Sequence, residues 1–169
     1  MRKPIVAVLL LALAACGEKR PDDPSVALGA AGFALHLPPA MQQALDAQAP
    51  GLRMVSTASF RSDVGQASAE SGGGLQPLFA LVGDFDGDGT QDAAVEGAMP
   101  GDSSLVVIAI LNSKKPTAME VTRFPTYDAD AVGIYLSKPA AGKPGAFSVV
   151  NYPDATTTYA FRQGKFVPQ

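Results

Sequence analysis

Four aspartates stand close together in the middle of this chain, at Asp84, Asp86, Asp88 and Asp92. Carboxylates in such proximity repel one another, and a bound divalent cation removes the repulsion. Calcium is the best candidate, because it accepts about six to eight oxygen ligands in a tolerant geometry, whereas magnesium requires a tighter octahedron. The residue types and their spacing therefore predict a calcium site.

The spacing matches the first three-quarters of an EF-hand calcium loop. With Asp84 at loop position 1, the other aspartates fall at positions 3, 5 and 9. Gly89 then takes position 6, where a sharp turn is needed, and the carbonyl of Thr90 takes position 7. The match ends before position 12, which is Val95 instead of a glutamate, and Glu96 comes one residue late. The chain therefore carries an incomplete EF-hand pattern.

The stretch at residues 83–97 also resembles the calcium loop of FG-GAP and VCBS-type repeats, in which a DxDxDGxxD pattern lies in a β-hairpin. The flanking runs at 78–82 and 93–95 are apolar and of strand length, which favours a loop between two strands. The resemblance implies that the four aspartates supply side-chain oxygens and Thr90 its backbone carbonyl. Those families usually build propeller blades from several copies, and this sequence shows no second copy. The resemblance thus implies a metal site and leaves the fold open.

Two questions about this loop stay open at the level of the sequence. Aspartate and glycine both favour turns, so an ordinary surface turn is the alternative to a metal site. A bound ion could hold a hairpin in place, or it could act in catalysis or regulation. We expect the structural role, because the loop uses its carboxylates on the ion.

The first fifteen residues predict a secretion signal, in which two basic residues precede an apolar run too short to span a bilayer. The signal ends in Leu-Ala-Ala-Cys, which resembles the bacterial lipobox and implies that Cys16 becomes the lipidated first residue of the mature protein. The alternative is an ordinary signal with a coincidental cysteine. Because Cys16 is the only cysteine, no disulfide is expected. By the same resemblance, Gly17 in place of an aspartate implies an outer-membrane location facing the periplasm.

The charge of the mature chain limits its partners. Removal of the signal takes two basic residues with it, so the net charge falls from −3 to −5. No basic block remains, and binding to nucleic acid or anionic lipid through charge is not expected. Attachment to the membrane would come from the acyl chains on Cys16, since each buried methylene contributes about 0.8 kcal/mol.

The mature chain is expected to contain a tether and one domain. Residues 16–32 lack hydrophobic periodicity and predict the tether, and residues 33–169 are long enough for a single calcium-binding domain with a real core. A strand is expected at 33–37. A helix follows from Pro39 to residue 48, because proline suits the first turn of a helix. The sequence further predicts a strand over 52–61 and a polar loop over 62–74.

The run at 105–111 is the most apolar of the mature chain and predicts a strand buried on both faces. Three more strands are expected at 119–124, 133–137 and 146–152, and a last hairpin pairs 156–162 with 165–167. These elements predict an α+β fold, with a mainly antiparallel sheet of seven or eight short strands and one N-terminal helix packed on it.

Nothing in the sequence makes a specific case for an enzyme. No nucleophile elbow, zinc-binding histidine pair or phosphate-binding loop is found. His36, the only histidine, lies in a predicted strand and is expected to face solvent or to be satisfied locally. Asp128 and Asp130 could form a carboxylate pair for glycoside hydrolysis, but a solvated turn is the expected reading.

We therefore expect a non-enzymatic, calcium-binding envelope lipoprotein that interacts with another envelope or secreted protein. An alternative is an inhibitor or immunity lipoprotein against lysozyme-like, peptidoglycan-degrading enzymes, which would present a loop such as 139–146. That alternative rests on analogy of size, location and calcium loop. A second alternative is a hydrolase that uses the calcium site electrostatically.

Overall fold

The computed structural model describes residues 22–30, 32–69, 77–101, 104–128, 130–138 and 145–169. The predicted signal peptide and the predicted lipidation site Cys16 lie outside these residues, as do 70–74 and 139–144 of the two predicted loops. Within the described ranges, no helix is long and apolar enough to cross a membrane.

The described part of the chain consists mainly of antiparallel β-structure, with two α-helices. The strands are β1 (Ser25–Gly29), β2 (Gly32–His36), β3 (Arg53–Met54), β4 (Ala80–Gly83), β5 (Asp92–Ala98), β6 (Leu105–Leu111), β7 (Thr117–Phe124), β8 (Ile134–Ser137), β9 (Ala146–Asn151), β10 (Ala155–Arg162) and β11 (Lys165–Pro168). The helices are α1 (Pro39–Gln48) and α2 (Ser62–Ser68), with a short 3₁₀ turn at Thr57–Ser59.

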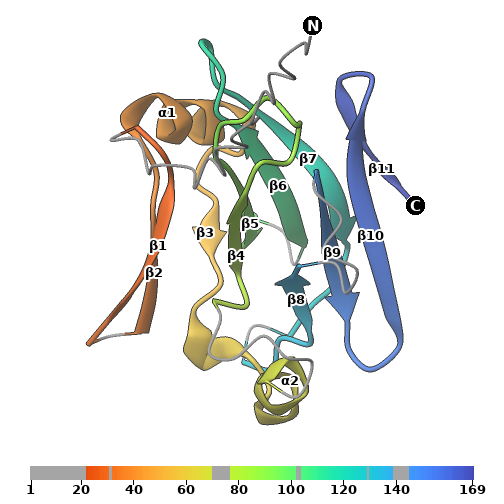
Figure 1. Cartoon of the computed structure of the whole chain (residues 1–169). Coiled ribbons are helices and arrows are strands. Elements are labelled where there is room, and N and C mark those ends of the chain that lie inside the picture. The colour runs from red at the N-terminus through yellow and green to blue at the C-terminus, as the bar shows by residue number, and fades with distance from the viewer. Residues whose placement is uncertain (1–21, 31, 70–76, 102–103, 129, 139–144) are drawn as a thin grey trace, which may run out of the picture.

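Three sheets form from these strands (Figure 1). In the largest, β6 pairs with β5 on one edge and with β7 on the other. The free edge of β5 is shared in succession by β4, which pairs with residues 92–95, and by β3, which pairs with residues 97–98. The second sheet has the order β11-β10-β9-β8, and β1 and β2 form a separate hairpin. The predicted hairpins β4–β5 and β10–β11 are confirmed by these pairings.

The side chains of β6 are buried on both faces, as its sequence predicts. Leu105, Val107, Ala109 and Leu111 point into a cluster shared with β8, β9 and β11. The side chains between them, at Val106, Ile108 and Ile110, point into a second cluster with Met41 and Leu45 of α1. Since successive side chains of a strand face opposite sides, one strand serves two cores.

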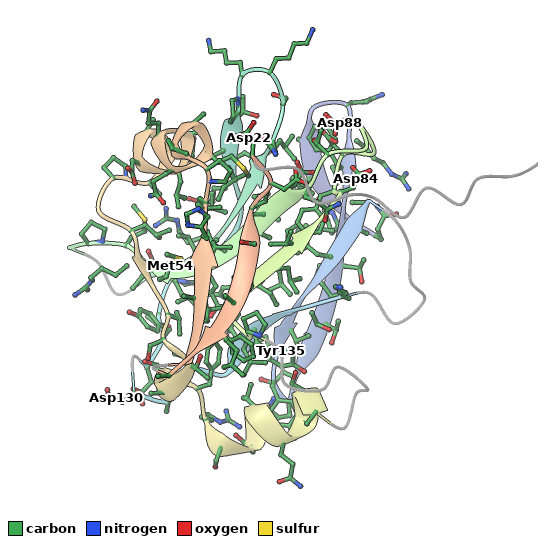
Figure 2. The ribbon with its side chains drawn as sticks, turned by 60° about the vertical axis from the view of Figure 1, so that its left-hand side comes forward. Asp22, Met54, Asp84, Asp88, Asp130 and Tyr135 are labelled. Atoms are coloured by element: carbon green, nitrogen blue, oxygen red, sulfur yellow. The ribbon has the colours of Figure 1, made fainter. Side chains whose placement is uncertain are left out.

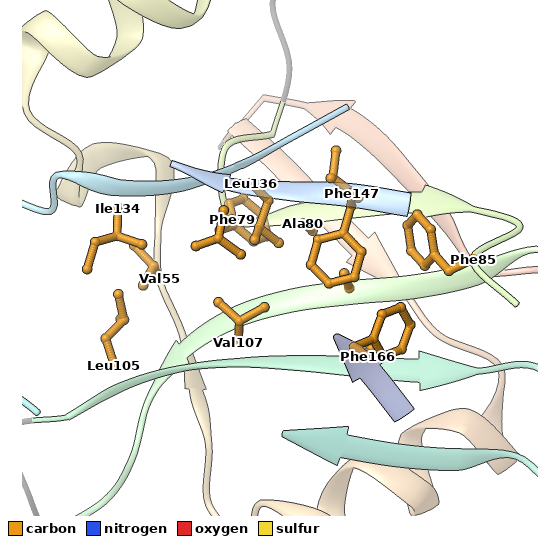
Figure 3. Packing of buried hydrophobic residues seen from close by; sticks show 14 of the residues in the cluster. Val55, Phe79, Ala80, Phe85, Leu105, Val107, Ile134, Leu136, Phe147 and Phe166 are labelled. Atoms are coloured by element: carbon orange, nitrogen blue, oxygen red, sulfur yellow. The ribbon is translucent and has the colours of Figure 1, made fainter. Parts of the chain in front are cut away.

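The domain is therefore layered, with α1 on one face of the large sheet and the four-stranded sheet on the other (Figure 1). Figure 3 shows the layer between the sheets, where Phe147 of β9 lies among Phe85, Phe166 and Leu136. Phe147 is fully buried, and its ring centroid lies 5.1 Å from that of Phe85 and 5.4 Å from that of Phe166. Such tilted aromatic pairs add to the stabilisation from burial alone.

The general α+β class is confirmed, but its details differ from those predicted. The described residues contain eleven strands in three sheets, instead of seven or eight in one sheet. They also contain a second α-helix besides the predicted N-terminal one. One of the added strands is β1, which lies within the predicted tether 16–32. All five of its residues pair with β2, and Val26 also packs against the cluster between the two sheets.

The segment after α1 also differs from the sequence-based expectation. Of the predicted strand over 52–61, only Arg53–Met54 pairs with another strand. The first part of the predicted loop over 62–74 forms α2. Val64 of this helix is fully buried against Leu78 and Tyr135. This contact with residues distant in the sequence stabilises the helix, which the polar local sequence does not predict.

Glu96 breaks the apolar pattern of the large sheet. It is 0% exposed, and neither oxygen of its carboxyl group has a hydrogen-bond partner among the described residues. Ala94 of the same strand faces the layer between the sheets, and the alternation of β5 places Glu96 on that face too. Burial alone raises the pKa of Glu96 well above its ordinary value. Burial therefore favours the protonated form of this carboxyl group in the folded domain.

We predict that Glu96→Gln makes the domain more stable at alkaline pH. The folded state keeps the proton of Glu96 where the unfolded chain releases it, so stability is full below about pH 4 and falls as pH rises. The glutamine cannot ionise, and the stability difference in its favour should grow by up to about 1.4 kcal/mol per pH unit. Urea unfolding at pH 5, 7 and 8.5 measures this difference.

Glu120→Gln is the control, because Glu120 is an exposed residue of β7 that pairs with Arg123. Loss of that surface ion pair should change the free energy of unfolding by less than about 1 kcal/mol. A constant difference between Glu96→Gln and the parent at all three pH values would show that Glu96 is already ionised in the folded state.

Candidate metal centre

The loop at residues 84–91 joins two adjacent strands of the large sheet. β4 ends at Gly83 and β5 begins at Asp92, and these two residues are register partners. The loop thus stands on a closed hairpin at one end of the domain, where Figure 2 shows Asp84 and Asp88, with Asp130 at the opposite end. The hairpin fixes both ends of the predicted calcium loop.

Three of the predicted ligands come together in this loop. Asp84, Asp86 and Asp88 each offer a carboxylate oxygen, and these oxygens all lie within 4.8 Å of one another. Two oxygens bound to the same calcium ion lie at most about 5 Å apart, because each bond is about 2.5 Å long. The three side chains can therefore hold one metal ion. They are half-buried or exposed, so an ion could reach them from solvent.

The backbone of the loop positions these carboxylates. The N–H of Gly87 donates to Asp84 Oδ1 at 2.7 Å, and the N–H of Gly89 donates to Asp84 Oδ2 at 3.0 Å. The N–H of Asp88 donates in turn to Asp86 Oδ1 at 3.0 Å. Each carboxylate oxygen has a second lone pair, so these hydrogen bonds leave acceptor sites for a cation. The loop is thus shaped by its own backbone hydrogen bonds.

The two glycines of the loop allow this shape. Gly87 and Gly89 have φ values of 83° and 85°, in the left-handed region that other residues rarely adopt. No atom lies within 4 Å of a β-carbon built at either position, so the requirement for glycine is conformational and not steric.

Asp92 has a different environment from the other three aspartates. It is 0% exposed, its Oδ2 accepts the N–H of Phe85 at 2.8 Å, and its Oδ1 accepts the N–H of Asn112 at 2.8 Å. Burial raises the pKa of Asp92 to about 6, and the negative charge of Asp86 adds to the rise. The structure does not bring its carboxylate into the group of three, and the hydrogen bonds of Asp92 instead fasten the loop to β6.

Thr90, whose carbonyl is a predicted ligand, uses its side chain to connect the loop to the sheet. Its hydroxyl oxygen lies 2.5 Å from Asp88 Oδ1 and 2.6 Å from the carbonyl oxygen of Asn112. A hydroxyl group has one proton, so Thr90 donates to one of these oxygens at a time. The participation of the Thr90 carbonyl in metal binding stays a prediction.

Phe85 anchors the loop in the core. Its side chain is buried between the two sheets and contacts Phe147, although the residues on either side of it are candidate metal ligands (Figure 3). The alternation of polar and apolar side chains at this point places the carboxylates outside and the ring inside. Burial of a phenylalanine contributes about 1.5–3 kcal/mol, which holds the loop against the domain.

The other residues considered in the sequence are not part of this centre. Val95, which stands at the twelfth position of the EF-hand pattern, is buried in the cluster below α1, and Glu96 is buried as described above. His36 is exposed at the end of β2. Asp128 accepts the N–H of Asp130 at 3.0 Å, the arrangement of the predicted solvated turn.

Sequence reasoning missed two residues at this site, Asn112 and Asp22. Asn112 follows β6 and contacts the loop through its backbone, and its side-chain amide donates to the carbonyl oxygen of Asp22 at 3.2 Å. Neither residue belongs to the aspartate pattern, and no periodicity or spacing connects them to it.

Comparison of the chain with protein-family models, curated proteins and solved structures finds no match.

We predict that Gly89→Ala destabilises the domain by about 1–2 kcal/mol, because alanine pays for a left-handed conformation that glycine adopts freely. It should also weaken metal binding, since the N–H of residue 89 holds Asp84. Thermal unfolding and a calcium titration measure the two effects. Gly65→Ala in α2 is the matched control and should stabilise the domain by about 0.5–1 kcal/mol. Equal stability of Gly89→Ala and the parent would mean that the loop adopts another shape.

Proposed function

We propose that this chain is a calcium-binding lipoprotein of the bacterial cell envelope, in which the ion stabilises the hairpin of β4 and β5. The observation that carries the proposal is the convergence of the Asp84, Asp86 and Asp88 carboxylates on one loop. The donor atoms are all carboxylate oxygens. Such oxygens suit hard cations, such as calcium and magnesium, better than they suit zinc or copper. The proposed function therefore depends on a binding site for a hard cation on the loop between β4 and β5.

Calcium is the preferred ion for this site. Three carboxylates close together supply a strong negative field, and further oxygens are available from the loop backbone and from water. Calcium accepts such a mixed set with variable geometry, whereas magnesium keeps most of its waters and takes one or two carboxylates. The pattern of glycines and aspartates leads to the same ion by its resemblance to known calcium loops.

A structural role for the ion follows from what the loop connects. The loop lies between β4 and β5, and Asp92 and Thr90 join it to Asn112 at the end of β6. An ion that fixes the loop would therefore stabilise three adjacent strands together. The repulsion among the carboxylates of the loop would be the cost that the ion removes.

The envelope location rests on the lipobox-like end of the signal at Cys16, and the proposed role is interaction with another envelope or secreted protein. Two large apolar side chains are exposed among the described residues, Leu28 at 63% in the β1–β2 hairpin and Met54 at 41% in β3. They are the first side chains to replace when such a partner is sought, because exposed apolar groups are favoured at protein contacts.

We predict that calcium raises the melting temperature of the mature chain. An ion that binds only the folded state at 100 times its dissociation constant stabilises that state by about 2.7 kcal/mol. For a domain of this size the melting temperature should rise by about 5–10 °C. Differential scanning calorimetry with calcium or with a chelator measures the rise.

Asp88→Ala should abolish this rise, since it removes one of the three converging carboxylates. Asp46→Asn is the control. Asp46 is an exposed residue of α1, and its carboxylate accepts a hydrogen bond from the side chain of Gln42 on the same helix. This substitution removes the same charge and should keep the full rise. Identical melting curves with calcium and with chelator would contradict the proposed metal site.

We predict that Cys16→Ser releases the protein from the membrane fraction of the expressing bacterium. Serine cannot carry the thioether-linked lipid, and the acyl chains are the proposed source of membrane affinity. Cell fractionation followed by immunoblotting measures the distribution. The neighbouring substitution Gly17→Ala should stay membrane-bound. A Cys16→Ser chain found in the membrane fraction as abundantly as the parent would contradict the lipid anchor.

A further inference from the structure

Asn112 contacts both the aspartate loop and the N-terminal segment. Its backbone N–H donates to Asp92 Oδ1 at 2.8 Å, and its carbonyl oxygen lies 2.6 Å from the Thr90 hydroxyl. Its side-chain amide donates to the carbonyl oxygen of Asp22 at 3.2 Å. The first two contacts use backbone atoms and the third uses the side chain. One residue thus connects two segments that are far apart in the sequence.

A pocket of about 380 Å³ lies where these segments meet. Its lining consists of Asp22, Asp23, Asp88, Thr90, Asn112, Ser113 and Lys114. Asp88 therefore shares a pocket with two aspartates of the N-terminal segment. Figure 2 shows Asp22 and Asp88 at the same end of the molecule. Asp23 is largely buried there, at 8% exposure.

Acidic residues outnumber basic ones in the lining of this pocket. Asp22, Asp23 and Asp88 are the acidic residues, and Lys114 is the basic one. Like charges on the rim of one pocket repel one another, and salt weakens this repulsion only beyond a screening length of about 8 Å at physiological ionic strength. A divalent cation on the loop would convert this repulsion into attraction.

We propose that metal binding to the aspartate loop and docking of residues 22–24 are coupled, with Asn112 as the positioning residue that links them. This inference rests on the proposed metal site. The ion fixes the loop, the loop holds Asn112 through Asp92 and Thr90, and the Asn112 side chain holds the N-terminal segment. Because coupling between two equilibria is reciprocal, the docked segment strengthens metal binding by the same factor.

The coupling has a consequence for a chain anchored through its N-terminus. Residue 22 follows the proposed anchor at Cys16 by six positions, and undocking of residues 22–24 would add three residues, about 10 Å of extended chain, between that anchor and β1. The metal-bound domain would be held close to the membrane, and the metal-free domain would have a longer reach. The ion would then regulate the distance at which the domain meets its partner.

The test compares hydrogen exchange of residues 22–30 in the full-length chain in detergent, with calcium chloride and with a chelator. In the parent, calcium should slow this exchange by about fivefold or more, at the lower end of typical couplings. Asn112→Ala removes only the side-chain contact with Asp22, since the contacts with Asp92 and Thr90 use the backbone. The slowing should be lost in this variant, and its calcium dissociation constant should rise by the factor lost.

Ser137→Ala is the matched control. Ser137 ends β8 and does not line this pocket, its hydroxyl donates to the carbonyl oxygen of Lys138 at 3.1 Å, and its substitution should leave both readouts at the values of the parent. Slowing that persists in Asn112→Ala would overturn the role of Asn112. Calcium that raises the melting temperature but leaves the exchange of residues 22–30 unchanged would overturn the coupling and leave the metal site intact. If calcium changed neither the melting temperature nor the exchange of residues 22–30, the proposed metal site itself would be overturned.

Discussion

Burial of β6 between two different apolar layers is the constraint that positions the rest of the domain. Six branched aliphatic side chains of this strand are buried, about half against α1 and half against the second sheet. At about 1.5–3 kcal/mol for each side chain, this strand alone contributes about 10 kcal/mol or more. That is comparable with the whole net stability of a typical domain, about 5–15 kcal/mol. Because β5 pairs along β6, the aspartate loop that precedes β5 starts from a rigid base.

The loop itself combines a favourable anchor with an unfavourable charge distribution. Phe85 is buried against Phe147, and Asp92 accepts two backbone N–H groups, so both ends of the loop are fixed. The three remaining aspartates converge outside this anchored base. Their mutual repulsion is tolerated because the core and the backbone hydrogen bonds hold the loop, and a cation would turn the same arrangement into a stabilising one. The candidate metal site is thus preorganised by Phe85 and Asp92, which lie outside the group of three carboxylates.

Glu96 is an acidic residue of the large sheet whose surroundings differ from those of the loop aspartates, because they favour the neutral form of the carboxyl group. The aspartates of the loop have solvent and a possible cation, whereas Glu96 has neither and lies in an apolar layer. In the loop, negative charge favours a ligand. In the core, the same charge costs free energy and is avoided by keeping the proton. Eight positions of the chain separate Asp88, the last aspartate of the group of three, from Glu96, whose burial favours the neutral form.

The sequence by itself determined the elements that depend on neighbouring residues. The hairpin around the loop, the helix from Pro39, the doubly buried strand at 105–111 and the last hairpin follow from local periodicity, turn residues and proline. Aspartate spacing likewise predicted the convergence of Asp84, Asp86 and Asp88, because side chains on one short loop are close in any fold. Only the tertiary structure decided the role of Asp92 and the place of Asn112, since their contacts join residues 20 and 90 positions apart. The same holds for α2, whose stability comes from burial of Val64 against residues that local sequence does not specify.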